Sequence, residues 1–421
     1  MKKFRIIAAG AIANIFEWYD YSLFGSLAYI LGQKFFSETD SASTILNSFM
    51  VFAVGYLMRP FGGIFFGILG DKFGRKFSLS LSVILMSIPT AAIGLIPTYD
   101  QAGIYASIFL VLIRLIQGLS MGGALTGSIS FLIEHTDKDK RGLIGSVTMS
   151  GICIGLLLGS FVAFVTRESI GASEFESWGW RIPFLLGIFN MFAGFYIIKY
   201  TEESPEFAKI DDAPQNPLFF ALQNNWHQMV MSIFINSIGS ILFYSHCVFV
   251  PNFLKTSRGF SDSFVDILSS VSMLNMAIFC IFSGYISDRI GRVKCMKWSV
   301  ILCMILIFAI SLCLEAGYDY FVVASHLLLG VLTALYLGPE PALQAEFYPA
   351  NVRSTALSVS YNTSTTIFGG TTPLIIAYLY YTTNSLHSFS LYILMASILS
   401  LIGLYFYKLP DEKSKTQGVK K

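Results

Sequence analysis

Long apolar runs, separated by short polar segments, follow one another from end to end of the chain. A helix that crosses a bilayer needs about 20 mostly apolar residues, and the alternating pattern of a soluble β-strand is absent. The pattern predicts an all-α polytopic membrane protein with twelve transmembrane helices. The expected spans are residues 7–31, 45–70, 77–97, 103–133, 142–166, 181–199, 227–252, 262–287, 297–315, 319–347, 352–379 and 387–408.

The one long polar interruption is residues 201–226, which are rich in Glu, Asp, Pro, Asn and Gln. Polar segments of this kind connect structured units, and this one leaves six predicted spans on each side. We therefore predict four parts of the chain: an N-terminal six-helix bundle at 1–200, a cytoplasmic linker at 201–226, a C-terminal six-helix bundle at 227–410 and a short cytoplasmic tail at 411–421.

A loop sequence occurs twice, once in each half of the chain. Gly67-Ile-Leu-Gly-Asp71-Lys72-Phe-Gly74-Arg75 follows the second predicted span, and Gly284-Tyr-Ile-Ser-Asp288-Arg289-Ile-Gly291-Arg292 follows the eighth. Internal repeats are typical of secondary transporters, whose substrate sites lie near the membrane midplane between the repeats. The simpler alternative is a pair of basic turns. We predict a role in conformational gating for Gly67, Asp71, Gly74, Arg75, Asp288, Arg289 and Arg292.

Basic residues favour one side of the predicted membrane. The chain has 28 Lys and Arg residues. If both termini lie in the cytoplasm, 21 of these residues fall in cytoplasmic segments and 4 in external segments, as the positive-inside rule requires. The 26 acidic residues nearly cancel the basic ones, so the net charge gives no argument for a nucleic-acid partner. The first run is expected to be retained as a helix, because it has no small-residue cleavage site of the secretory type.

Sequence motifs of enzymes and cofactor sites are missing. No phosphate-binding loop, zinc-protease motif, nucleophile elbow or dinucleotide fingerprint is present, and the 6 cysteines lack metal-ligand spacing. We therefore expect no enzyme activity, no cofactor and no metal. The expected partners are a small solute, protons and the lipid bilayer, with no obligate protein partner.

Two acids lie inside the first predicted span, where a charge is costly unless it faces a cavity or a partner. Glu17 and Asp20 are three residues apart and share a helix face with Asn14 and Tyr21. One interpretation is a site that binds and releases a proton. The alternative is a structural ion pair with a basic residue, either Arg59 or Arg114.

Other polar residues lie deep in later spans. Arg114 needs an anion, either a protein carboxylate or a substrate carboxylate held at two points. In the tenth span, Gly338-Pro339-Glu340-Pro341 must interrupt the helix, because proline lacks a backbone donor, and a broken helix is tolerated where it lines a cavity. Glu340 is then either a second substrate or proton group, or a structural acid. Further candidates for the cavity wall are Gln117, Tyr361 and Asn362.

The chain resembles the major facilitator superfamily, and within it the metabolite:proton symporters, which include proline/betaine, 2-oxoglutarate, citrate and shikimate transporters. Besides the repeated loop, the resemblance rests on Asn14-Ile-Phe-Glu17-Trp18-Tyr19-Asp20-Tyr21, Arg59-Pro60-Phe-Gly62-Gly63, Arg114-Leu-Ile-Gln117-Gly118, Trp178-Gly-Trp180-Arg181-Ile-Pro183-Phe184 and Glu202-Glu203-Ser204-Pro205. It implies the major facilitator fold, symport by alternating access, and a bacterial cytoplasmic (inner) membrane.

The resemblance implies a solute:proton symporter for a small zwitterionic or carboxylate metabolite, with a proline/betaine-like solute favoured. One departure bears on coupling. Gly122-Gly123-Ala124-Leu125 has Ala and Leu where the symporters usually have Glu and Tyr. An uncoupled facilitator or a transporter-like sensor therefore stays an alternative, as does a 2-oxoglutarate/citrate-type dicarboxylate symporter.

Overall fold

The computed structural model describes residues 2–36, 55–210 and 214–407. Within these ranges every regular element is helical, which confirms the predicted all-α class. Residues 45–54 of the predicted second span and the predicted tail at 411–421 lie outside the described residues.

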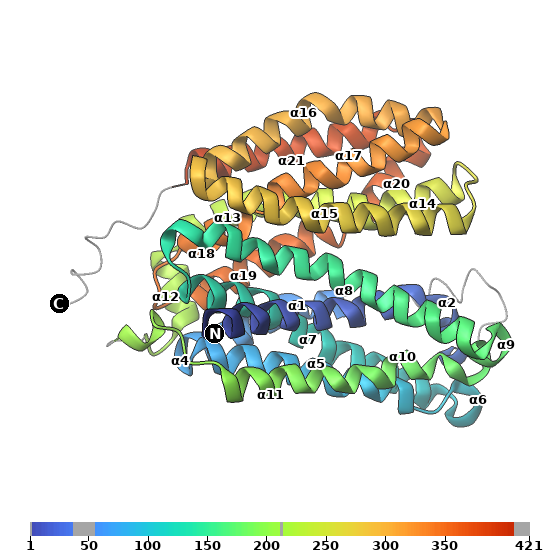
Figure 1. The fold of residues 1–421 in the computed structure, drawn as a ribbon, viewed down its shortest axis with the longest axis horizontal. Helices are drawn as coiled ribbons and strands as arrows, with labels where there is room; N and C mark the ends of the chain where they lie inside the picture. The colour runs from blue at the N-terminus through green and yellow to red at the C-terminus, as the bar shows by residue number, and fades with distance from the viewer. Residues whose placement is uncertain (1, 37–54, 211–213, 408–421) are drawn as a thin grey trace.

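The helices form two groups, which lie one above the other in Figure 1 with their long axes roughly parallel. The first group comprises α1 (Lys2–Ser26), α2 (Ala28–Phe35), α4 (Arg59–Lys72), α5 (Arg75–Leu95), α6 (Tyr99–Ala102), α7 (Ile104–Glu134), η1 (Lys138–Lys140), α8 (Arg141–Ile170), α9 (Ala172–Glu174), η2 (Phe175–Gly179), α10 (Arg181–Leu186), η3 (Gly187–Phe189) and α11 (Asn190–Tyr200).

The second group begins after η4 (Phe207–Lys209) and α12 (Pro217–Asn224), which belong to the polar segment between the groups. It comprises α13 (Trp226–Tyr244), η5 (Ser245–Phe249), α14 (Val250–Thr256), α15 (Asp262–Ile290), α16 (Arg292–Ala316), α17 (Asp319–Leu337), α18 (Glu340–Glu346), α19 (Arg353–Ser364), η6 (Thr365–Gly369), α20 (Thr372–Thr383) and α21 (His387–Tyr405).

In the described part of the chain, nine helical stretches are long and apolar enough to cross a membrane. The other three predicted spans correspond to α1, to α4 with the residues before it, and to α19 with α20. Helix α1 is long enough (25 residues) but less apolar, because it carries Glu17 and Asp20. Helices α4 (14 residues), α19 (12 residues, rich in Ser and Thr) and α20 (12 residues) are each too short to cross by themselves. Side chains that face other helices need not be lipophilic.

One difference from the predicted spans and one agreement with them have clear reasons. Helix α8 ends at Ile170, four residues beyond the prediction, because a helix can continue through its polar residues Arg167 and Glu168 after it leaves the apolar layer. The tenth span is broken as predicted: α17 ends at Leu337 and α18 begins at Glu340, at the two prolines.

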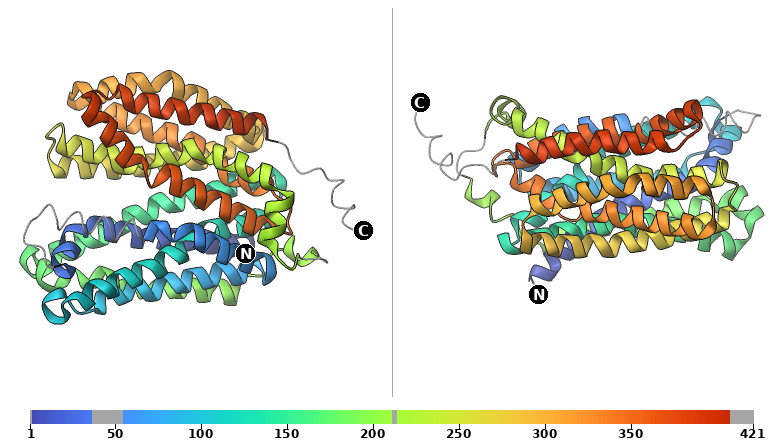
Figure 2. Two further views of the ribbon diagram at one scale, coloured as in Figure 1. Left: turned by 180° about the vertical axis from the view of Figure 1, so that it is seen from behind. Right: turned by 90° about the horizontal axis from the view of Figure 1, so that it is seen from above.

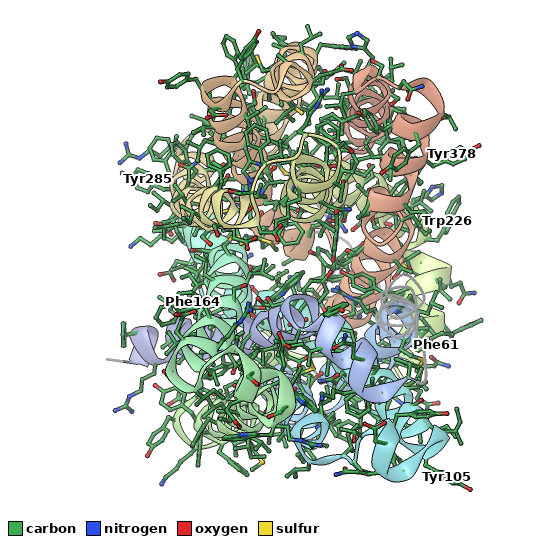
Figure 3. The ribbon with its side chains drawn as sticks, turned by 90° about the vertical axis from the view of Figure 1, so that its right-hand side faces the viewer. Phe61, Tyr105, Phe164, Trp226, Tyr285 and Tyr378 are labelled. Carbon is green, nitrogen blue, oxygen red and sulfur yellow. The ribbon has the colours of Figure 1, made fainter. Side chains whose placement is uncertain are left out.

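The two groups meet through α8 against α15 and α4 against α19. The second contact is close because α4 presents glycine: a Cβ on Gly67 would lie 2.7 Å from the Thr355 Cα atom. The described start of α1 and the end of α21 lie at the same end of the molecule (Figures 1 and 2). Phe61, Tyr105, Phe164 and Tyr378 point outward from the bundle (Figure 3) and are more than half exposed, as expected for side chains in contact with lipid.

Candidate functional site

Aromatic rings from both halves meet at the centre of the molecule. Trp18 of α1 lies 5.0 Å from Tyr21 and 5.3 Å from Phe243 of α13, measured between ring centroids. Tyr56 lies 6.2 Å from Tyr21 and 5.9 Å from Tyr244. Because these rings come from α1, from the helical residues before α4 and from α13, the cluster bridges the two groups of helices.

Arg59, the first residue of α4, lies beside this aromatic cluster and is only 1% exposed. Its guanidinium is 5.1 Å from the Tyr56 ring centroid and donates to the Tyr56 hydroxyl at 3.2 Å. It also donates to the side-chain oxygen of Asn362 on α19 at 3.4 Å. In turn, the Asn362 amide donates to the Gly122 carbonyl at 2.8 Å. The predicted site residue Asn362 therefore joins α19 of the second group to α4 and α7 of the first.

Glu17 is 2% exposed, and neither of its carboxylate oxygens has a hydrogen-bond partner among the described residues. Arg59 acts on it electrostatically. The side chain lines a small cavity of about 10 Å³, enough for about one water molecule, together with Ala13, Phe16, Val83, Met86, Ala124 and Asn190. The small side chain of Ala124 thus leaves room next to Glu17, at the position where the resembling symporters usually have an acid.

Asp20 has partners. It lies 3.4 Å from the Arg114 guanidinium and accepts a hydrogen bond of 2.9 Å from the Gln117 amide. The guanidinium of Arg114 also covers the Phe24 ring at 3.4 Å from its centroid. Asn14 donates to the Ser128 hydroxyl at 2.7 Å. These four predicted site residues therefore join α1 to α7 within the N-terminal group, as in the ion-pair interpretation.

The remaining predicted site residues are Tyr21, Tyr361 and Glu340. Tyr21 is part of the aromatic cluster. Tyr361 on α19 is 8% exposed and interacts electrostatically with Glu340, Arg59 and Glu17. Glu340 is fully buried at the start of α18.

The two copies of the repeated loop make reciprocal contacts between the halves. Asp71 in the first half accepts hydrogen bonds from the backbone N–H groups of Ser354 and Thr355, at the start of α19, at 3.1 and 2.8 Å. Asp288 in the second half accepts from the N–H groups of Gly142 and Leu143, at the start of α8, at 2.7 and 2.8 Å. Each aspartate therefore caps a helix of the opposite half, where unpaired N–H groups favour an anion.

The basic residues of the repeated loops extend these contacts, with one exception. Arg75 pairs with Asp71 at 2.8 Å and donates to the Ala350 carbonyl of the other half at 2.5 Å. Arg292 pairs with Asp288 at 3.3 Å. Arg289 instead packs on the Tyr285 ring, 4.4 Å from its centroid, and is exposed. Among the predicted gating residues, it lies apart from the contact between the halves.

Gly74 has a different role at the same end of the molecule. It has φ of 105°, a conformation that glycine adopts without strain, and a Cβ there would lie 2.1 Å from a Glu203 carboxylate oxygen. That carboxylate accepts from the Arg75 N–H at 3.0 Å. Gly74 therefore lets an acid of the polar segment cap α5.

An ion-pair network at this end was not predicted from the sequence. Arg353 of the second half contacts Glu134 of the first half at 2.8 Å and Glu206 of the polar segment at 2.6 Å. Arg141 contacts Glu206 at 2.5 Å. Burial disfavours the charge on Glu206, but Arg353 and Arg141 outweigh that effect and hold the pKa of its carboxyl below the usual value. The sequence signal was available, since Glu206 follows the Glu202-Glu203-Ser204-Pro205 motif directly.

Comparison with protein families assigns both halves. Residues 6–215 match the family model described as "Sugar (and other) transporter", and residues 229–421 match that of the Major Facilitator Superfamily. The glycine betaine/proline/ectoine/pipecolic acid transporter OusA of Dickeya dadantii is 30% identical, with 96% of this chain and 83% of that protein covered. The chain belongs to the major facilitator superfamily. Its members are transporters, so this protein is a membrane transporter and not an enzyme.

Other relatives agree. The proline/betaine transporter of Salmonella typhimurium is 30% identical over 94% of this chain and 82% of that protein. Among solved structures, the proton:xylose symporter XylE matches with a TM-score of 0.76 at 16% identity, covering 96% of this chain and 95% of that chain. The human organic anion transporter MFSD10 matches with a TM-score of 0.66 at 14% identity, covering 97% of this chain and all of that chain (100%). These structures support the twelve-helix major facilitator fold.

Proposed function

We propose that this transporter imports a small zwitterionic osmolyte of the proline/betaine class together with protons, by alternating access between its two bundles. The single observation that carries the proposal is the central pairing of Arg59 with an aromatic cluster shared by both halves. The names of the relatives, which are proline and betaine transporters, agree with it.

The two ends of a zwitterion need different surroundings. Aromatic faces attract quaternary and alkylated ammonium groups through their quadrupole, which suits the cluster of Trp18, Tyr21, Tyr56 and Tyr244. A guanidinium can hold a carboxylate through two parallel hydrogen bonds, which suits Arg59. Both features belong to residues that lie between the halves, so a bound solute would contact both bundles.

The same residues suggest how protons are coupled to the solute. Arg59 is the cation that acts on Glu17, whose oxygens have no hydrogen-bond partner among the described residues. When the solute carboxylate takes the guanidinium, Glu17 is left as a buried acid without its compensating charge. Such an acid binds a proton rather than stay ionised. Solute binding therefore favours proton binding, as symport requires.

A dicarboxylate substrate is the weaker candidate. It would need a second cation near Arg59, whereas Arg114 already pairs with Asp20 and lies over Phe24.

The proposal also includes the organisation of the chain: two bundles at residues 1–200 and 227–410, with a cytoplasmic linker and tail. We further propose that the protein lies in a bacterial cytoplasmic membrane, that both termini are in the cytoplasm, and that it acts without an obligate protein partner. The 21 to 4 bias of basic residues supports the orientation of the termini, and the bacterial relatives support the bacterial membrane.

The test is uptake of radiolabelled glycine betaine, proline and 2-oxoglutarate into proteoliposomes, with and without an inward proton gradient. We expect gradient-driven accumulation of betaine or proline. Equilibration without accumulation would indicate a facilitator. Accumulation of 2-oxoglutarate alone would overturn the assignment of the substrate class.

A further inference from the structure

Glu340 is a buried acid that the proposed coupling does not use. It is the first residue of α18, immediately after the break in the tenth span at Gly338 and Pro339. Its exposure is 0%, and neither carboxylate oxygen has a hydrogen-bond partner among the described residues.

The polar groups around Glu340 are directed elsewhere. Gln344, one turn further along α18, is close enough to favour the charged form of the carboxyl, but it makes no hydrogen bond of normal geometry to Glu340. Its amide is held by Ser232 of α13 through a donated and an accepted hydrogen bond. The Tyr336 hydroxyl pairs with Ser400 at 2.7 Å. On the facing helix α13 stands Gly239, where a Cβ would lie 3.1 Å from a Glu340 oxygen.

The titratable groups that face Glu340 are Tyr336 on α17 and Tyr361 on α19. No Lys, Arg or His within the described ranges acts on it electrostatically. It differs in this from the other two acids of the central region, because Asp20 has Arg114 and Glu17 has Arg59.

An ionised carboxylate without a cation or donor costs several kcal/mol in a low-dielectric interior. A neutral acid avoids that cost, so Glu340 carries a proton in this conformation. It is also placed to lose that proton. Helix α18 packs against α8 of the other half, where a Cβ on Gly145 would lie 3.2 Å from the Ala342 nitrogen. Separation of the halves at this end would expose α18 to water.

We propose that Glu340 is a second proton-binding site, located in the C-terminal bundle, which releases its proton when α8 and α18 separate, so that two protons accompany each solute. This inference rests on the proposed symport. It adds a proton-binding residue that is independent of Arg59. The solute carboxylate and Glu17 compete for the Arg59 guanidinium, whereas Glu340 has no cation nearby that the solute could take.

The test is the proton-to-solute ratio, measured in proteoliposomes with the membrane potential clamped at zero. With a gradient of one pH unit, two coupled protons support about hundredfold accumulation of solute and one supports about tenfold. We expect the wild type to approach the higher limit and E340Q the lower one. The matched control is D319N, an exposed acid at the start of α17, which should behave as the wild type.

Three outcomes separate the two proposals. A ratio of one in the wild type, or a ratio of two that survives in E340Q, would overturn the role of Glu340. Absence of gradient-driven accumulation in the wild type would instead overturn the proposed symport.

Infrared spectroscopy gives a second measurement if E340Q binds solute but does not transport it. The purified wild type should show the C=O stretch of a protonated carboxylic acid that E340Q lacks and that E340D shifts. Spectra of wild type and E340Q that coincide in this region would show that Glu340 is ionised, and would overturn the inference.

Discussion

Arg59 is the residue on which the proposed recognition of a carboxylate depends. A hydrogen bond to a charged group contributes about 1.5–3 kcal/mol, and each 1.4 kcal/mol is about tenfold in affinity. We expect R59Q to raise the KM for betaine at least tenfold, with R59K in between because lysine keeps the charge but not the two-point geometry. The measurement is the concentration dependence of initial uptake.

The control for this prediction is R114K, since Arg114 is paired with Asp20 inside one half. Carboxylate recognition by Arg59 would be contradicted if R59Q and R114K raised the KM equally and R59Q still bound betaine with normal affinity in calorimetry.

Tyr244 tests the other end of the solute. Its ring belongs to the aromatic cluster, while its hydroxyl has no hydrogen-bond partner within the described residues. Removal of the ring in Y244L should weaken betaine binding by about 0.5–2 kcal/mol, a larger effect than for proline, whose ammonium is less alkylated. Y244F keeps the ring and should bind betaine as the wild type does. Competition assays with both solutes measure the difference, and an equal loss for betaine and proline in Y244L would contradict the cation–π role.

The chemistry of these residues was readable from the sequence, but their pairing was not. The sequence placed Glu17, Asp20 and Arg114 inside spans and left open whether each acid was paired. The answer depends on the rotation of α7 and α4 against α1, which sets Arg114 against Asp20 and leaves Glu17 facing a cavity beside Ala124. Such rotations depend on packing between helices rather than on any local pattern, so Arg59 was anticipated only as a partner for an acid.

At the scale of elements, sequence signals were more complete. The repeated loops predicted a gating role for Asp71 and Asp288, and the prolines predicted the break between α17 and α18. The partners of the loops could not be predicted, because they are the first turns of α19 and α8 in the opposite halves. The first turn of any helix has free backbone N–H groups, whatever its side chains are. The sequence therefore does not indicate which helix start an aspartate will cap.

Loss of one aspartate cap should shift the balance between conformations. A side-chain cap contributes about 0.5–2 kcal/mol, and a change of one to two kcal/mol alters an equilibrium about 5–30-fold. We expect D71A and D288A, which remove the accepting side chains, each to increase opening between α4 and α19 or between α15 and α8, and the double variant to do so more strongly. Distances between spin labels on the helix ends would report the populations. Unchanged distance distributions in the double variant would show that the caps do not hold this state.

The whole molecule is closed at one end by contacts that also involve the polar segment between the halves. Glu206 joins Arg353 of one half to Arg141 of the other, although it was predicted only as part of a linker. We predict that the linker is part of a gate at this end, because Glu206 can contact both arginines only while the two helix starts are close together.

The pH dependence of this contact has a definite sign. The pKa of Glu206 lies below its usual value because Arg353 and Arg141 outweigh the effect of burial. A lowered folded-state pKa means that the stabilisation is complete above the ordinary carboxyl range, near pH 4.3, and is lost only as the pH falls through the lower folded-state value. Glu206 therefore stays ionised throughout the neutral range, where transport is driven.

E206Q should consequently change the gate without changing the pH profile of transport. We expect more opening at the end where α12 and α18 lie, and a faster or slower turnover by the same factor at every pH between 6 and 8. Variants at Glu17 or Glu340, which are proposed to carry protons, should alter the shape of the profile itself. Initial rates of betaine uptake across this range measure both effects. A change in the shape of the profile in E206Q would mean that the ion-pair network takes part in proton transfer, and that coupling is not confined to the centre of the molecule.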